Sequence, residues 1–108
     1  NHSGQFVFLE EPKGYYANRW LSTVLFTNIQ MRNELTREKV RLELEKFNIE
    51  SRPLWKPMHL QPVFKDAPAY SNGISEKLFE SGICLPSGTQ MSQKMVTEIA
   101  EKIKQIIR

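Results

Sequence analysis

The spacing of apolar residues in the last part of the chain predicts its clearest helix. Apolar side chains recur there with a period of about 3.6 residues, as on one face of an amphipathic helix. They are Val96, Ile99, Ala100, Ile103, Ile106 and Ile107. Ser92 stands where a helix cap is expected, and Met91 before it can pack against the first turn. The pattern predicts a helix from about Ser92 to the C-terminus.

A second helix is predicted from Thr36 to Phe47. Thr36 can cap its start, and Leu35 can act as an apolar staple. Apolar residues then follow at spacings of four and three, which predicts one buried stripe made of Val40, Leu44 and Phe47. Asn48 suits the left-handed position after a helix, and Ile49 can make the accompanying apolar contact.

Short apolar runs predict the strands. These runs are Phe6–Leu9, Trp20–Asn28, Ile49–Arg52 and Ile83–Leu85, and a short helix is expected at Ser75–Ser81. The longest run is apolar on both faces, with Trp20, Val24 and Phe26 on one and Leu21 and Leu25 on the other. Helices that alternate with short strands predict a two-layer α+β fold with a short, mainly antiparallel sheet and about three helices.

The segment from Arg52 to Phe64 combines three prolines with six large apolar residues and several polar ones. Prolines remove backbone donors and fix φ, which indicates a rigid extended segment that is suited to lining a cleft. His59 can donate or accept a hydrogen bond near neutral pH. Arg52 and Lys56 can hold a phosphate or carboxylate, and Trp55 can stack on a sugar or base. Composition alone favours the other interpretation, a packed connection whose polar ends reach water.

Composition narrows the function classes. The net charge of +3 is spread over mixed acidic and basic residues, and no apolar run approaches the ~20 residues that span a membrane. No signal peptide is visible, and the single Cys84 fits the reducing cytoplasm, where we expect it to be a small core residue. The chain contains no self-contained catalytic motif, and two scattered histidines with one cysteine argue against a zinc site.

Three motifs occur in order along the chain: Asn18-Arg19-Trp20-Leu21, then Arg52-Pro-Leu-Trp-Lys-Pro-Met-His-Leu-Gln-Pro62, then Ser81-Gly-Ile-Cys-Leu-Pro-Ser-Gly88. Together they resemble the C-terminal small domain of the pyridoxal-phosphate-dependent nucleotide-sugar aminotransferases, the DegT/StrS family. The resemblance covers roughly Tyr16 to Arg108. Each motif alone is loose, but the three in register are fairly specific.

The resemblance implies a function for the parent protein. Family members transfer an amino group, usually from glutamate, to a keto group of a nucleotide-linked sugar, for surface polysaccharides, glycans or antibiotics. It also implies an aspartate-aminotransferase-type fold with the active site at a homodimer interface. His59, in the Pro-Met-His motif, is implied to face the sugar-nucleotide substrate. Three more substrate-binding residues are expected from their place in the motif and their chemistry, namely Arg52, Trp55 and Lys56.

We expect this chain to be one part of that enzyme. Residues 1–14 would be an entry segment and 15–108 the small domain, while the large domain with the Schiff-base lysine is absent from the chain. The chain begins at Asn1 rather than Met, which suggests a processed or excised piece. We therefore expect no bound pyridoxal phosphate and no transamination by this chain alone. Nucleic acid and membrane partners are not expected.

Two other readings remain open. A pI near 9.1, together with two Trp and six Phe, would suit a free-standing nucleic-acid-binding module, although the basic residues are mixed with acidic ones. A protein-interaction domain would use the two-sided apolar strand and the isoleucine-rich last helix.

Overall fold

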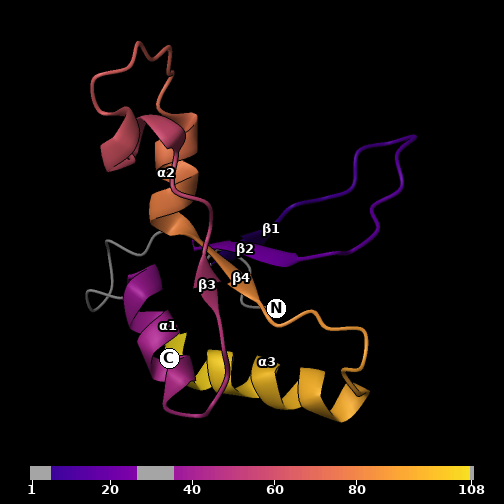
Figure 1. Cartoon of the computed structure of the whole chain (residues 1–108). Coiled ribbons are helices and arrows are strands. Elements are labelled where there is room, and N and C mark those ends of the chain that lie inside the picture. The colour runs from indigo at the N-terminus through magenta and orange to yellow at the C-terminus, as the bar shows by residue number, and fades with distance from the viewer. Residues whose placement is uncertain (1–5, 27–35, 108) are drawn as a thin grey trace.

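The computed structural model describes residues 6–26 and 36–107, which form one sheet and three α-helices (Figure 1). The strands are β1 (Phe6–Phe8), β2 (Ser22–Phe26), β3 (Arg52–Pro53) and β4 (Gly82–Leu85). The helices are α1 (Arg37–Glu45), α2 (Ile74–Ser81) and α3 (Gln93–Ile107), with 3₁₀ turns η2 (Met58–Leu60) and η3 (Pro62–Phe64). The sheet is antiparallel throughout, in the order β1-β2-β4-β3. For the described residues this confirms the expected α+β fold.

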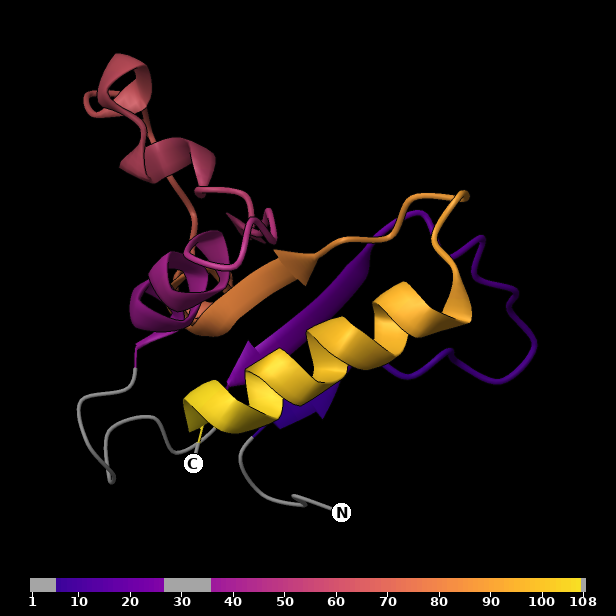
Figure 2. The ribbon, with the colours of Figure 1, turned by 90° about the horizontal axis from the view of Figure 1, so that it is seen from below.

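The core lies between the sheet and helices α1 and α3. Alternate residues of a strand point to one face, and on β2 these are Val24 and Phe26, which are 3% and 4% exposed. Ile83 of β4 stands opposite Val24 and is equally buried. Val40 and Leu44, one turn apart on α1, close the core from the other side. Figure 2 shows α3 lying along β2 in front of the sheet, where its last isoleucines pack on this core.

Helix α1 has the caps that its sequence predicts. The Thr36 hydroxyl accepts a hydrogen bond from the Lys39 N–H at 3.1 Å. Asn48 adopts φ 56°, and the Ile49 N–H then donates to the Leu44 carbonyl at 3.0 Å. This is the Schellman motif, in which a helix ends at a residue in the left-handed conformation. The expected staple residue Leu35 lies outside the described residues.

Three details of the predicted elements are wrong. Phe47 was predicted to complete the buried stripe of α1, but it is 45% exposed because the helix ends at Glu45. The Lys102 ammonium lies 4.4 Å from the centroid of its ring. Trp20 was predicted to begin a strand and to share a face with Val24 and Phe26, but it is 72% exposed. Arg19 before it adopts φ 55°, and the strand begins only at Ser22.

The third error concerns the strand expected at Ile49–Arg52, of which only the last residue pairs in the sheet. The Ile49 N–H is already used by the turn that ends α1, so the segment cannot join the sheet there. Strand β3 instead consists of Arg52 and Pro53, opposite Cys84 and Ile83 of β4. The predicted end of β2 at residues 27–28 lies outside the described residues.

Residues 54–73, called the arm below, leave the sheet after β3 and return through α2 (Figure 1). The arm is joined to the sheet at its base, where the Leu54 N–H donates to the Gly82 carbonyl at 3.3 Å. A Cβ at Gly82 would lie 2.6 Å from Cγ of Leu54 and 2.7 Å from the carbonyl oxygen of Leu78. Glycine is therefore required at the junction of α2 and β4 for close approach.

Candidate functional site

The proline-rich segment forms two 3₁₀ turns, which corrects the expectation of a segment extended throughout. Pro57 is still extended, with φ −52° and ψ 140°, but it caps η2, and Pro62 opens η3. The fixed φ of proline suits the start of a helical turn, so the same residues that exclude a long helix favour these short ones. The first turn is closed by the Leu60 N–H, which donates to the Pro57 carbonyl at 3.0 Å.

The turns place His59 against α2, where it pairs with Glu76 in the first turn of that helix. His59 Nε2 lies 2.6 Å from Glu76 Oε1, and the two side chains are 24% and 25% exposed. The Ser71 hydroxyl donates to the same carboxylate oxygen at 2.7 Å, and the Ser75 hydroxyl donates to the other at 3.0 Å. One carboxylate thus joins η2, α2 and the loop before α2.

These contacts lower the pKa of Glu76 from 4.5 to about 2. The hydrogen bond from Ser71 is the largest cause, followed by the backbone N–H of Glu76 itself, with further contributions from Ser75 and His59. The carboxylate is therefore ionised at neutral pH and can only accept hydrogen bonds. Nε2 of His59 must supply the proton that the two groups share.

His59 also lines a shallow hollow of about 820 Å³ on the arm and α2. Its lining combines polar and apolar side chains, namely His59, Ala69, Tyr70, Ser71, Asn72, Ile74, Ser75 and Leu78. Both serine hydroxyls donate to Glu76 and not to the imidazole, so the imidazole does not activate them as nucleophiles. The hollow therefore offers hydrogen-bonding groups suited to binding a polar ligand.

The other three predicted site residues lie apart from this hollow. Trp55 is 65% exposed and packs against Trp20, with ring centroids 6.5 Å apart and planes tilted by 41°. Lys56 is exposed, and its carbonyl accepts a hydrogen bond from the Gln61 side chain at 3.1 Å. Arg52 pairs with Glu50 at 2.6 Å, with both side chains more than 70% exposed. None of the three lines the hollow beside His59.

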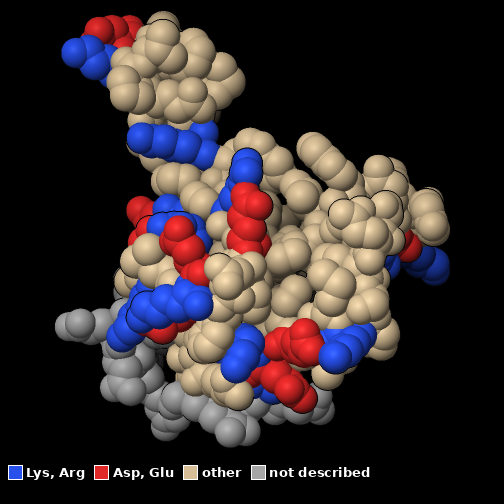
Figure 3. Space-filling model, turned by 60° about the horizontal axis from the view of Figure 1, so that its bottom comes forward, with Lys and Arg blue, Asp and Glu red and all other residues tan. Residues whose placement is uncertain are grey.

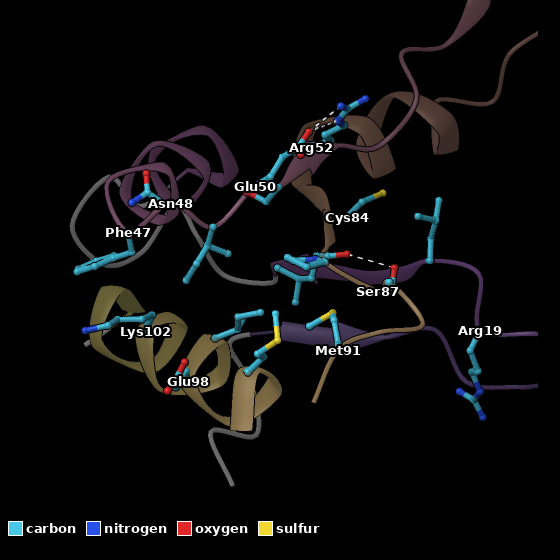
Figure 4. A pocket seen from close by; sticks show the side chains of 18 of the residues that line it. Arg19, Phe47, Asn48, Glu50, Arg52, Cys84, Ser87, Met91, Glu98 and Lys102 are labelled. Carbon is cyan, nitrogen blue, oxygen red and sulfur yellow. Dashed lines mark hydrogen bonds and ion pairs between the residues drawn. The ribbon is translucent and has the colours of Figure 1, made fainter. Parts of the chain in front are cut away.

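A larger groove of about 1320 Å³ lies between β4, the end of α1 and helix α3 (Figure 4). Arg52 and Glu50 stand paired at one edge, and Lys102 and Glu98 of α3 border the other. Cys84 also lines it, and burial raises the pKa of its thiol, so it is not activated as a nucleophile. Arg52 is the predicted site residue that this groove contains.

The described residues contain no group of three or more His, Cys, Asp or Glu side chains placed to hold a metal ion. Within the same residues, none of the helices combines the length and the apolar character that spanning a membrane requires.

Glu76 and Ser71 are site residues that the sequence reasoning missed. Glu76 lies 17 residues from His59, so no local motif links them. One signal was available: Ser71-Asn72-Gly73 precedes a helix with an acid in its first turn, which is a common polar start to a helix. It would have suggested a helix cap but not the histidine partner.

Comparison with known proteins decides the family. The model of the DegT/DnrJ/EryC1/StrS aminotransferase family matches residues 4–104. The chain belongs to this family. The resemblance drawn from the three motifs is thereby confirmed.

Named relatives in the family agree with this assignment. EpsN of Bacillus subtilis, provisionally named a pyridoxal phosphate-dependent aminotransferase, is 41% identical over 90 residues, covering 80% of this chain and 22% of EpsN. GDP-perosamine synthase of Escherichia coli O157:H7 is 30% identical over 96 residues, covering 89% of this chain and 25% of that enzyme. The chain thus spans about a quarter of the length of the relatives it matches.

Solved structures of aminotransferases share the fold. The aminotransferase TlmJ from Streptoalloteichus hindustanus superposes with a TM-score of 0.78 at 16% identity, over 95% of this chain and 26% of TlmJ. Spr1654 from Streptococcus pneumoniae, provisionally named a sugar aminotransferase, gives 0.79 at 22% identity, over 97% and 26%. At these identities the comparison establishes the architecture.

The described residues do not provide a site for the pyridoxal phosphate that the family uses. The cofactor requires a lysine amine directed into a closed site together with groups that bind its phosphate. Every lysine in the described residues is exposed except Lys102, whose ammonium lies over Phe47, and no lysine lines the hollow beside His59. No step of a reaction is therefore assigned to the cofactor within this chain.

Proposed function

We propose that this chain is the C-terminal small domain of a pyridoxal-phosphate-dependent aminotransferase that transfers an amino group from glutamate to a keto group of a nucleotide-linked sugar. The observation that carries the proposal is the family match over residues 4–104, in a chain that covers about a quarter of its relatives. Residues 15–108 form the domain proper in this proposal, and residues 1–14 lead into it and contribute strand β1 to its sheet.

The substrate class is supported by the names of the relatives. GDP-perosamine synthases from Escherichia coli and Vibrio cholerae are named for a GDP-linked sugar, and Spr1654 is named as a sugar aminotransferase. The hollow beside His59 has the hydrogen-bonding character that a sugar requires. We assign the whole enzyme to the cytoplasm and to the synthesis of surface polysaccharides or glycans.

Within this proposal His59 contacts the sugar nucleotide, and the cofactor is held by the rest of the protein. Trp55, with Trp20, offers an exposed aromatic face that can stack on a base or sugar. Lys56, the next residue in the chain, and Arg52, which is paired with Glu50, supply positive charge. The active site completes at a homodimer interface. The isolated chain is proposed to be inactive because it lacks the cofactor lysine.

The role of His59 has its own test in the whole enzyme. His59→Ala is expected to raise KM for the sugar nucleotide, because the imidazole hydrogen bond is lost, while the absorption spectrum of the bound cofactor stays unchanged. Steady-state kinetics and the visible spectrum check both. Loss of the cofactor from this variant would contradict a role on the substrate side.

The domain assignment is tested by the mass of the gene product in its own cell. An antibody raised against this chain should detect a band several times heavier than 12.6 kDa. A band at 12.6 kDa alone would overturn the proposal and favour a binding or regulatory module.

A nucleic-acid-binding role finds little support in the surface. On the face shown in Figure 3, basic and acidic side chains lie beside one another and do not gather into a patch of one sign. Arg41 pairs with Glu38 at 2.7 Å, and Lys46 pairs with Glu43 at 2.6 Å. A basic stripe that follows a phosphate backbone requires the opposite arrangement.

A further inference from the structure

The imidazole of His59 has two nitrogens, and the structure commits one of them. Nε2 lies 2.6 Å from Oε1 of Glu76, which is ionised and can only accept. The proton of this hydrogen bond therefore resides on Nε2. Nδ1 is then the nitrogen left for a ligand in the hollow that His59 lines.

The carboxylate is itself held in place from several directions. Oε1 accepts from Ser71 and Oε2 accepts from Ser75, at 2.7 and 3.0 Å. The Ser71 hydroxyl oxygen in turn accepts from the Gly73 N–H at 3.1 Å, which ties it to the start of α2. The first turn of a helix also favours a negative charge through the helix dipole. Glu76 is thus a fixed acceptor to which His59 must adapt.

We infer that Glu76 is a positioning residue: its carboxylate fixes the proton of His59 on Nε2 and so determines that Nδ1 is offered to the ligand. In other proteins, a carboxylate that accepts a hydrogen bond from one imidazole nitrogen likewise fixes the tautomer and leaves the other nitrogen free to bind. The importance of this for catalysis rests on the proposed function, because it assumes that His59 contacts the sugar nucleotide. The proton position itself does not depend on that assumption.

Nitrogen-15 NMR of the histidine rings in the 108-residue chain tests the inference without any ligand. The spectrum is recorded at about pH 9, where an ordinary imidazole is neutral, and His59→Asn identifies the signals by removing them and leaving those of His2. The expected result is a protonated Nε2 and an unprotonated Nδ1, with a slowly exchanging Nε2 proton shifted downfield by the carboxylate.

Three variants separate positioning from packing. Glu76→Gln keeps an acceptor oxygen of similar shape and should retain the Nε2 proton signal, less far downfield. Glu76→Ala should lose the slow exchange and the downfield shift while the backbone spectrum stays dispersed. Glu80→Ala, which removes an exposed glutamate of the same helix, should change neither.

Two results would overturn the inference. One is a wild-type His59 protonated on Nδ1; the other is an Nε2 signal that Glu76→Ala leaves unchanged. If Glu76→Ala does not fold, the wild-type and Glu76→Gln spectra decide, since an identical proton shift in the two would exclude an effect of the carboxylate charge. His59→Ala kinetics decides the proposed function separately, so the two failures are distinguishable.

Discussion

At the scale of single residues, burial on α1 changes within two positions. Leu44 is fully buried in the core, whereas Leu42 is 45% exposed, because a helix turns by about 100° per residue and so places the two on different faces. Both are leucines in the same helix, so they share helix propensity and differ mainly in what surrounds them. They therefore form a matched pair for measuring the contribution of the core.

Leu44→Ala is expected to lower the free energy of unfolding by about 2–5 kcal/mol, through lost burial and a cavity that the core cannot fill. Leu42→Ala should change it by about 0.5 kcal/mol. Urea denaturation of the two variants and the wild type measures both values. Similar losses from the two substitutions would mean that the core is not where the structure places it.

Gly82 allows a second prediction, at the base of the arm. Gly82→Ala is expected to destabilise the fold by about 1–3 kcal/mol, because the new Cβ would overlap Leu54 and crowd the carbonyl of Leu78. Gly88→Ala is the control, since its Cβ would meet nothing closer than 3.9 Å, on Gln90. Thermal melts of both variants test this, and an equal effect of the two would contradict the close packing of Leu54 on Gly82.

The carboxylate of Glu76 predicts a pH dependence. Because folding lowers its pKa from 4.5 to about 2, its contribution to stability is present above about pH 4.5 and is lost as the pH falls toward 2. Glu76→Gln does not titrate, so the stability advantage of the wild type over this variant should be larger at about pH 5 than at about pH 3. Denaturant unfolding at the two pH values measures it. An advantage that does not change with pH would show that Glu76 is not stabilised as its contacts indicate.

At the scale of elements, capping residues and hydrophobic periodicity predicted the features that depend on neighbouring residues in the chain. Thr36 and Asn48 delimit α1 as expected, since a cap and a left-handed residue act on neighbouring backbone. The isoleucine period of α3 predicted a helix whose last residues pack on the core. Phe47 fitted the same periodicity but lies beyond the end of its helix, where the period no longer applies. Pattern alone does not show where a helix stops, so its last apolar position was misassigned.

The cap of α1 can be tested directly. Thr36→Ala should cost about 0.5–2 kcal/mol, because the Lys39 N–H loses its acceptor at the helix start, whereas Thr36→Ser keeps the hydroxyl and should cost much less. Chemical denaturation followed by circular dichroism compares the two. The cap would be unimportant if Ser and Ala proved equally costly.

The proline-rich segment shows where element prediction failed for a physical reason. Three prolines exclude a long helix and a central strand, and that inference was correct. They do not exclude short 3₁₀ turns, which proline can begin, and η2 and η3 are such turns. The turns direct His59 toward α2 and leave Trp55 beside Trp20, so the residues expected along one wall are divided between two places.

At the scale of the whole molecule, the sequence predicted the fold class and the family better than the site. The sheet and the three helices follow from patterns that act within single elements, and the three motifs in register identified the family. The partner of His59 comes from a helix 17 residues away, and only folding brings the two together. Within the described residues, His59 lies at a shallow hollow formed by the arm and α2.

The measurement that tests the central claim most directly is amino transfer by the native gene product that contains this chain. The protein, purified from its own cell, is mixed with L-glutamate in the absence of any sugar, and 2-oxoglutarate is quantified alongside the cofactor spectrum. The account predicts bound pyridoxal phosphate, a change of its spectrum to that of the pyridoxamine form, and about one 2-oxoglutarate per subunit. A product that carries no pyridoxal phosphate and releases no 2-oxoglutarate would contradict it.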